Sequence, residues 1–232
     1  MAHNDGGGAL WLLVHKEVRL GASMSQRLQT INERRLAFYS RNTVLNRMPK
    51  IRINNLTNGD GFADLCGPAI KAANSRSLVP FVAELVMEFM DSGSVYHKAI
   101  QKMFKSAKSI LDLLYRASMF LSFQEKLDLK RDIMSLGKYF QLAQTLASAD
   151  AEPLWHLTPK VHQTMHIPKQ ASLNNPVVVQ CYKDESFVGV VTQIWHAQAA
   201  GGYLKTVQWT VLFKYLLGLS LLLDIPLGNQ ER

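Results

Sequence analysis

Residues 96–121, YHKAIQKMFKSAKSILDLLYRASMFL, decide the fold class of this 232-residue chain. Apolar side chains recur there with the period of an α-helix, and lysines occupy the opposite face. The apolar stripe consists of Ile100, Met103, Phe104, Ala107, Ile110, Leu111 and Leu114, and the lysines are Lys98, Lys102, Lys105 and Lys108. Such a stripe predicts an amphipathic helix that packs against a core, and a hydrophobic fraction of 47% is enough to build one.

A helix is also expected on the N-terminal side of residues 96–121. Ser77 is the expected N-cap, and Pro80 lies near the first turn, where a proline is tolerated. The cluster Asp-Ser-Gly-Ser at residues 91–94 ends that helix. Residues 69–148 are therefore expected to be helical almost throughout.

A third helical pattern follows on the C-terminal side. Ser122 and Glu125 match a capping box, in which two side chains satisfy backbone N–H groups at a helix start. The helix is expected to end near Ala149. Its recurring apolar residues are Leu127, Ile133, Leu136, Tyr139, Phe140 and Leu146. The sequence thus predicts a mainly α fold, with a helical domain at residues 69–232 and a short extended segment near residues 177–182.

Residues 1–68 are expected to form a basic, loop-rich N-terminal arm. Residues 3–8 contain three consecutive glycines and are expected to be a flexible start. Residues 25–39 fit a short basic amphipathic helix, and residues 50–54 alternate in polarity and could form a lone strand. The dipeptide Gly-Pro at residues 67–68 marks a soft boundary with the helical domain.

The positive charge of the chain is concentrated near its N-terminus. The net charge is +8, and residues 1–55 hold nine Lys/Arg against three Asp/Glu, while the remaining residues hold 17 against 15. Basic charge gathered at one end favours an anionic partner, of which nucleic acid, either DNA or RNA, is the commonest. The alternative is a solvated basic arm that contacts nothing in particular.

Eight cations are the candidate nucleic-acid-binding residues, six from the arm and two from residues 96–121. They are Arg27, Arg34, Arg35, Arg41, Lys50, Arg52, Lys102 and Lys105. Five aromatic side chains could add base stacking, although large aromatic side chains are usually buried: Trp155, Trp195, Trp209, Tyr182 and Tyr203.

Two cysteines, Cys66 and Cys181, cannot build a disulfide framework, so a reducing intracellular compartment is expected, with the nucleus as one option. Residues 207–223 form an apolar run that polar residues interrupt, and it falls short of the roughly 20 residues that span a bilayer. We interpret that run as a buried terminal helix and expect no membrane partner.

His162 and His166 are the candidate metal ligands. Their spacing of four residues places both rings on one face of a helix, as in many zinc sites. The zincin motif is incomplete, because Gln163 stands where its glutamate would be. His156, Asp184, Glu185 and His196 are the further side chains that could complete a His/carboxylate site. Alternatively, the rings hydrogen-bond around the neighbouring proline turns and stabilise packing.

Asp184 and Glu185 are the candidate catalytic carboxylates. They follow an apolar extended segment and precede an expected helix, so they could hold a divalent metal beside a phosphate. They could equally cap that helix, because negative charge is favoured at a helix N-terminus. Two-metal phosphoryl transfer needs several converging acidic groups, and one such pair does not supply them.

Short motifs in residues 155–189 resemble a pattern found in uncharacterised proteins of dinoflagellate algae. The motifs are WHLTPKVH at 155–162, Met165-His166, Asn174-Asn175-Pro176 and CYKDESFVG at 181–189. Those algal proteins resemble the C-terminal part of cut-and-paste DNA transposases. The resemblance covers residues 70–223, including Ser-Leu-Val-Pro at 77–80 and Lys-Tyr-Leu-Leu-Gly-Leu at 214–219.

The resemblance implies that Glu185 matches the last carboxylate of the three-carboxylate, RNase-H-like transposase site. The strands that carry the first two aspartates in that family are not visible here, and the residues before position 70 leave little room for them. The resemblance therefore implies a remnant of a mobile element that lacks a complete catalytic site.

Three functions remain as hypotheses. The leading one is a mobile-element-derived, nucleic-acid-binding protein without a complete catalytic site. The second is a metal-dependent phosphoryl-transfer enzyme that uses Glu185 and Asp184, with His162 and His166 at the metal. The third is a helical protein-interaction module.

Overall fold

The computed structural model describes residues 2–44, 47–56, 63, 65, 74–150, 152, 154–156, 159–171 and 174–177. The chain divides into two compact units, Met1–Val179 and Gln180–Arg232, and all the described residues lie in the first unit. The fold is mainly α, as the sequence predicts, and the described residues contain no strand.

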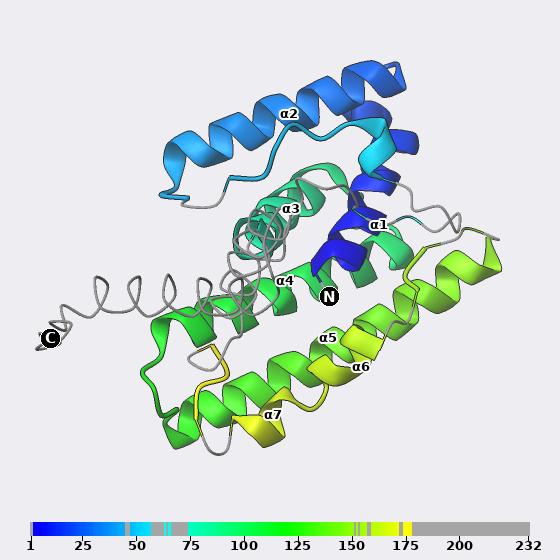
Figure 1. Cartoon of the computed structure of the whole chain (residues 1–232). Coiled ribbons are helices and arrows are strands. Elements are labelled where there is room, and N and C mark those ends of the chain that lie inside the picture. Colours follow the sequence, from blue (N-terminus) through cyan, green and yellow to red (C-terminus); the bar gives the residue numbers. More distant parts are fainter. Residues whose placement is uncertain are drawn as a thin grey trace, which may run out of the picture. The chain divides into compact units, whose positions relative to one another are not determined.

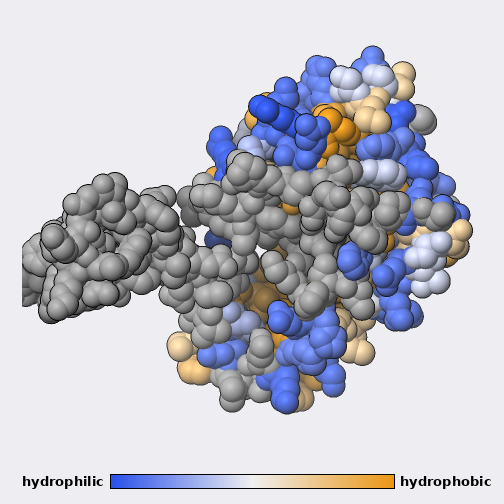
Figure 2. Space-filling view, turned by 45° about the vertical axis from the view of Figure 1, so that its right-hand side comes forward, coloured by the Kyte–Doolittle hydropathy of each residue, from blue (hydrophilic) through white to orange (hydrophobic). Residues whose placement is uncertain are grey.

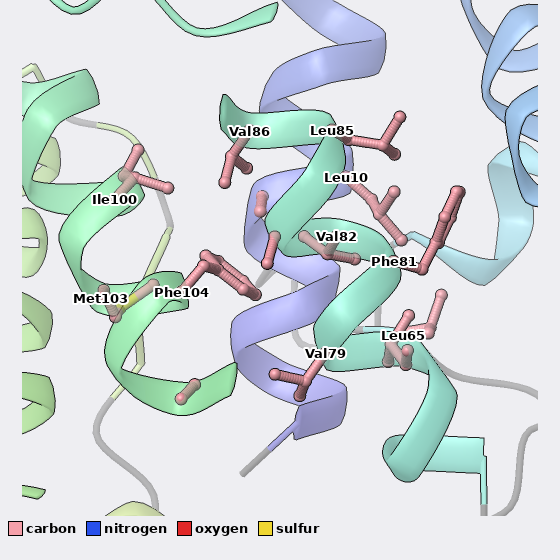
Figure 3. Packing of buried hydrophobic residues seen from close by; sticks show 14 of the residues in the cluster. Leu10, Leu65, Val79, Phe81, Val82, Leu85, Val86, Ile100, Met103 and Phe104 are labelled. Carbon is pink, nitrogen blue, oxygen red and sulfur yellow. The ribbon is translucent and has the colours of Figure 1, made fainter. Parts of the chain in front are cut away.

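Three helices form the centre of the first unit: α3 (Ser75–Phe89), α4 (Val95–Arg116) and α5 (Phe123–Ala149). Helix α4 packs against both α3 and α5 and lies between them (Figure 1). The apolar stripe expected on α4 is buried except for Leu111, which is half-buried against the core. Figure 3 shows Phe104 reaching from α4 toward the face of α3 that carries Val82.

Helices α4 and α5 form an antiparallel hairpin. Ser106 Oγ on α4 lies 2.9 Å from Ser135 Oγ on α5, and Ser109, three residues later, donates to the earlier residue Asp132. The capping box at the start of α5 is confirmed, because Ser122 and Glu125 each accept a hydrogen bond from the other's backbone N–H. One residue of the expected stripe is misplaced: Leu127 is 45% exposed, whereas Leu129 faces the core.

Helix α3 begins earlier than expected. Asn74 is its N-cap, and Ser77 instead lies inside the helix, where its hydroxyl donates to the Asn74 carbonyl. Pro80 therefore stands inside the helix rather than near the first turn. Its missing N–H removes only one intrahelical bond, and the packed neighbours of α3 offset that loss.

Helix α4 ends at Arg116, before the expected end at residue 121, because a distant side chain caps it. Asn175 is 1% exposed, and its Nδ2 donates to the carbonyls of Leu114 and Ser118 at 2.8 and 3.1 Å. The Asn175 backbone N–H donates to the Met119 carbonyl. The bond to Leu114 satisfies a carbonyl group that the helix end leaves without an intrahelical partner, and the other bonds hold the residues that follow α4.

The expected flexible start at residues 3–8 is wrong, because these residues belong to α1 (Ala2–His15), which packs against α2 and α3. Leu10 and Leu13 are fully buried in the core. Glycines allow α1 to approach its neighbours closely. A Cβ built on Gly6 would lie 3.0 Å from Leu78, and one on Gly8 would lie 3.2 Å from the Trp155 ring.

The expected basic helix at residues 25–39 is confirmed as α2 (Met24–Arg41), which follows the short η1 (Val18–Leu20). Its N-cap is Ser23, which forms a capping box with Gln26. The lone strand expected at residues 50–54 is wrong, since the described residues 47–56 contain no strand. The buried Asn32 side chain forms two hydrogen bonds of 2.9 Å with the Ile51 backbone. These bonds hold the segment around Ile51 against α2.

The remaining described elements are short. The 3-10 helix η2 spans Ile53–Asn55, and the helices α6 (Pro159–Thr164) and α7 (Ile167–Gln170) follow α5. Helix α7 contacts α5. Four predicted features lie outside the described residues: the boundary at residues 67–68, the extended segment beyond Val177, the helix expected after Glu185, and the terminal helix at residues 207–223.

Candidate functional site

Two of the eight candidate cations, Arg27 and Arg35, donate hydrogen bonds to backbone carbonyls of the fold. Arg27 donates from its guanidinium to the carbonyls of Gly21, Val14 and His15 at 2.8 to 3.1 Å, which caps the C-terminal end of α1. Arg35 is 7% exposed and donates to the Met48 carbonyl. Both guanidinium groups are therefore committed to backbone carbonyls rather than presented to a partner.

Two further candidates are neutralised by α3. Arg34 lies 2.7 Å from Glu88, and Arg41 lies 3.0 Å from Glu84. These partly exposed ion pairs contribute at most about 1 kcal/mol each. They nevertheless cancel two of the positive charges that favoured an N-terminal arm for an anionic partner.

Four of the candidates form no ion pair among the residues that the structure describes. Lys50 and Arg52 are exposed on the chain segment that lies along α2. Lys102 and Lys105 are exposed on α4. A lysine or arginine that is not paired with a carboxylate keeps its full charge for a partner. These four residues therefore stay candidates for binding nucleic acid.

The two α4 lysines belong to a larger cluster that spans both helices of the hairpin. Lys102 Nζ lies 5.2 Å from the centre of the Tyr139 ring, and Lys138 Nζ lies 5.8 Å from the centre of the same ring. We name this surface the lysine face: Lys98, Lys102, Lys105 and Lys138, together with Tyr139. None of its four lysines forms an ion pair with a carboxylate in the described ranges.

Two other cations of the hairpin are paired with acids. Lys108 forms an ion pair with Asp112 on α4. Arg131 on α5 lies within 3.0 Å of Asp128 and Asp132 and bonds both carboxylates. In Figure 2, hydrophilic residues make up most of the visible surface outside the grey atoms. The lysine face therefore differs from these two cations by its lack of paired acids, and not by its polarity.

Sequence reasoning missed Lys138 and Tyr139 as parts of this surface. Tyr139 was expected on the apolar stripe of α5, and it is half-buried beside the core. No local pattern could have found the pair, because the register between α4 and α5 decides which α5 side chains lie beside Lys102. The signal that the sequence did carry is the repetition of lysines along α4.

The two candidate metal ligands are brought together by the structure. His162 Nε2 and His166 Nε2 lie 3.2 Å apart, and the ring centres are 4.9 Å apart. Both side chains are exposed. No third histidine, cysteine or carboxylate joins them within the described ranges.

The candidate catalytic residues Asp184 and Glu185 lie outside the described residues, as does His196. Their roles in catalysis and in completing a metal site stay predictions. The phosphoryl-transfer hypothesis requires Glu185 to converge with His162 and His166, and that convergence is equally untested.

Trp155 is not available to stack on a base. It is 2% exposed, and its indole N–H donates to the Tyr96 hydroxyl at 2.8 Å. Burial raises the pKa of Tyr96 above its ordinary value, and the hydrogen bond from Trp155 opposes part of that rise. Trp155 therefore anchors the chain after α5 to the start of α4.

Large apolar side chains are exposed around the turn between α4 and α5. Phe120 is 65% exposed, Phe123 is 78% exposed, and Met119 and Leu127 are also exposed. Exposed apolar side chains that lie together are typical of interaction surfaces. These exposed side chains are consistent with a protein-interaction module, which stays a prediction.

No helix within the described ranges combines the length and the apolar character needed to cross a bilayer. In the comparisons with known proteins, no family model, no curated protein and no solved structure matches the chain.

Proposed function

We propose that this protein binds nucleic acid through the lysine face of the α4–α5 hairpin. One observation carries the proposal: Lys102 and Lys138 come from different helices, and both lie within 6 Å of the Tyr139 ring centre. No carboxylate in the described ranges forms an ion pair with either lysine. Like charges gathered without a counter-charge repel one another, so an anionic partner stabilises the arrangement.

The spacing of the α4 lysines suits a phosphate backbone. Lys98, Lys102 and Lys105 share one side of α4 and span about 10 Å along its axis, at a rise of about 1.5 Å per residue. That length corresponds to about three nucleotide steps of one strand. Lys138 adds a fourth cation from the neighbouring helix.

Tyr139 supports this surface in two ways. Its ring attracts the two ammonium groups, an interaction of about 0.5–1 kcal/mol at exposed sites, and so limits their freedom before a partner binds. The ring is half-buried against the core, so the lysines project from a packed scaffold. Contacts of this kind are made to phosphates and read no sequence.

Residues 70–223 resemble the algal proteins, and those proteins in turn resemble transposases, which favours DNA as the nucleic acid and a mobile element as the origin of the chain. The proposed role is that of a binding remnant without a complete catalytic site. The lysine face lies within the span of that resemblance.

The test compares two variants that lose the same number of positive charges. The first replaces the lysine face (Lys98→Gln, Lys102→Gln, Lys105→Gln and Lys138→Gln). The control replaces four exposed cations that are held in ion pairs (Lys16→Gln, Arg19→Gln, Arg34→Gln and Arg41→Gln). Affinity for a duplex and for a single strand is measured by fluorescence anisotropy over a series of salt concentrations.

We expect the unmodified protein to bind more weakly as salt rises, because binding releases counterions. The lysine-face variant should bind at least tenfold more weakly, and its salt slope should fall by about 0.9 for each phosphate that it no longer neutralises. The control variant should keep most of the affinity. Equal losses of affinity in both variants would show that net charge alone matters and would overturn the lysine face as the binding surface.

A further inference from the structure

We propose that His162 and His166 form a two-histidine chelating site for a late first-row divalent cation such as Zn²⁺, Ni²⁺ or Cu²⁺. The inference is independent of nucleic-acid binding and rests on the geometry of the two rings. Both Nε2 atoms point to one place, 3.2 Å apart, and both side chains are exposed to a metal ion from solution.

The distance between the two nitrogens matches shared coordination. Zinc binds imidazole nitrogen at about 2.0–2.1 Å, so two nitrogens in a tetrahedral arrangement lie about 3.3 Å apart. A hydrogen bond between the two rings satisfies the same distance. In that case one ring donates, the other accepts, and no ion is needed.

The local fold keeps the two rings together after the helix has ended. Helix α6 ends at Thr164, and the next two residues continue the turn through tighter bonds: Met165 N–H donates to the His162 carbonyl and His166 N–H to the Gln163 carbonyl, both at 3.0 Å. This turn holds the His166 ring beside the His162 ring.

The same turn is anchored to α5. Gly137 leaves space for the Met165 side chain, since a Cβ built there would lie 2.6 Å from Met165 Cε. Val161 and Ala171 are buried on either side of the histidine pair. Because these contacts fix the backbone on both sides, the pair is positioned before any metal binds, which reduces the entropy lost on binding.

The chemistry of the pair selects the class of cation. Neutral imidazole suits Zn²⁺, Ni²⁺ and Cu²⁺, whereas Mg²⁺ and Ca²⁺ prefer oxygen ligands. Two protein ligands leave other positions on the ion for water or an added ligand. The affinity should follow the general order for divalent metals, with Cu²⁺ bound most tightly.

The test uses the full chain, freed of metal by a chelator and titrated by calorimetry with Zn²⁺ alone and with Cu²⁺ alone. The variants are His162→Ala, His166→Ala and the double substitution. His156→Ala serves as the control, because it removes an exposed imidazole from the same part of the chain. Circular dichroism of each metal-free variant verifies that the helical fold is retained.

We expect each single substitution to weaken binding of both metals at least tenfold, and the control to bind as the unmodified protein does. Metal should also raise the melting temperature of the unmodified protein, because it binds the folded state, and should not raise that of the double variant. The inference is overturned if the double variant binds as tightly as the unmodified protein. It is also overturned if that variant loses metal-free stability while its metal binding is unchanged, since the rings would then only hydrogen-bond.

Discussion

At the scale of single residues, the capping box at the start of α5 contains a hydrogen-bonded carboxylate, that of Glu125, whose pKa differs from its ordinary value. The Glu125 carboxylate accepts hydrogen bonds from the backbone N–H and the hydroxyl of Ser122, both at 2.8 Å. These bonds favour the charged form, and the backbone bond is the larger cause of the lowered pKa of Glu125.

The stabilisation from Glu125 should therefore depend on pH. Because folding lowers its pKa, the contribution is fully present above the ordinary value of 4.5 and is lost as the pH falls through the lowered value. Glu125→Gln keeps a capping side chain but cannot ionise. The difference in urea midpoint between the unmodified protein and this variant, measured from pH 6 to pH 3, should shrink as the pH falls. A difference that grows on acidification would contradict this account.

The basic residues show that a positively charged residue in the sequence does not always present its charge to a partner at the protein surface. Arg27 and Arg35 donate to backbone carbonyls, so their role is structural. Arg34 is paired with an acid of α3. Lys102 has the same formal charge and no ion-pair partner among the described residues. It lies against the Tyr139 ring instead, so its charge stays available to a partner.

At the scale of elements, the end of α4 depends on a residue far along the chain. The Asn175 side chain bonds carbonyls from the last turn of α4 and the residues after it, and its Oδ1 accepts from the Val177 N–H. Asn175 belongs to the Asn-Asn-Pro motif at residues 174–176. The structure gives this part of the motif a role in packing.

Asn175→Ala should destabilise the protein by about 1–3 kcal/mol, because it leaves the buried Leu114 carbonyl at the end of α4 without its donor. The neighbouring substitution Asn174→Ala is the control, since Asn174 is only half-buried. Its effect should stay within about 0.5 kcal/mol. Both values come from urea unfolding followed by circular dichroism. Equal effects of the two substitutions would show that the Asn175 side chain does not cap α4.

The three consecutive glycines of α1 disfavour a helix locally, but they permit close packing of α1 in the fold. Each glycine inside a helix costs about 1 kcal/mol relative to alanine, and Gly6 to Gly8 place three of them together. Locally, this run favours a coil. In the fold, the missing side chains let α1 approach Leu78 and Trp155, and the apolar area that it buries outweighs the cost.

At the scale of the first unit, the N-terminal helices are part of the core. Leu10→Ala should lower the free energy of unfolding by about 2–5 kcal/mol, because Leu10 is fully buried. Leu36→Ala, at a 60% exposed position of α2, should change it by less than about 0.5 kcal/mol. Chemical unfolding monitored by circular dichroism measures both.

The opposite result for Leu10→Ala would favour the prediction that residues 1–68 form a separate arm. If Leu10→Ala left the unfolding transition of α3 to α5 unchanged, α1 would not belong to the core. The packing of α1 also affects how nucleic-acid binding is tested. Removing residues 1–55 deletes part of the core, so substitutions at the lysine face are the cleaner experiment.

The sequence by itself determined the mainly α fold, the apolar stripe of α4, and the cap formed by Ser122 and Glu125. These features depend on contacts between residues at most a few positions apart, so their pattern can be read directly along the chain. The spacing of His162 and His166 belongs to the same class. Their rings meet because one turn of backbone brings them together.

Only the tertiary structure decided which of the described cations lack a paired acid, where α4 ends, and that a glycine-rich start becomes a buried helix. Tyr139 joins Lys102 through the register of two helices, and Asn175 caps α4 across a separation of 61 residues from Leu114. Such contacts depend on how apolar faces pack. Sequence periodicity shows which face of a helix is buried, but not which residue of another helix it meets.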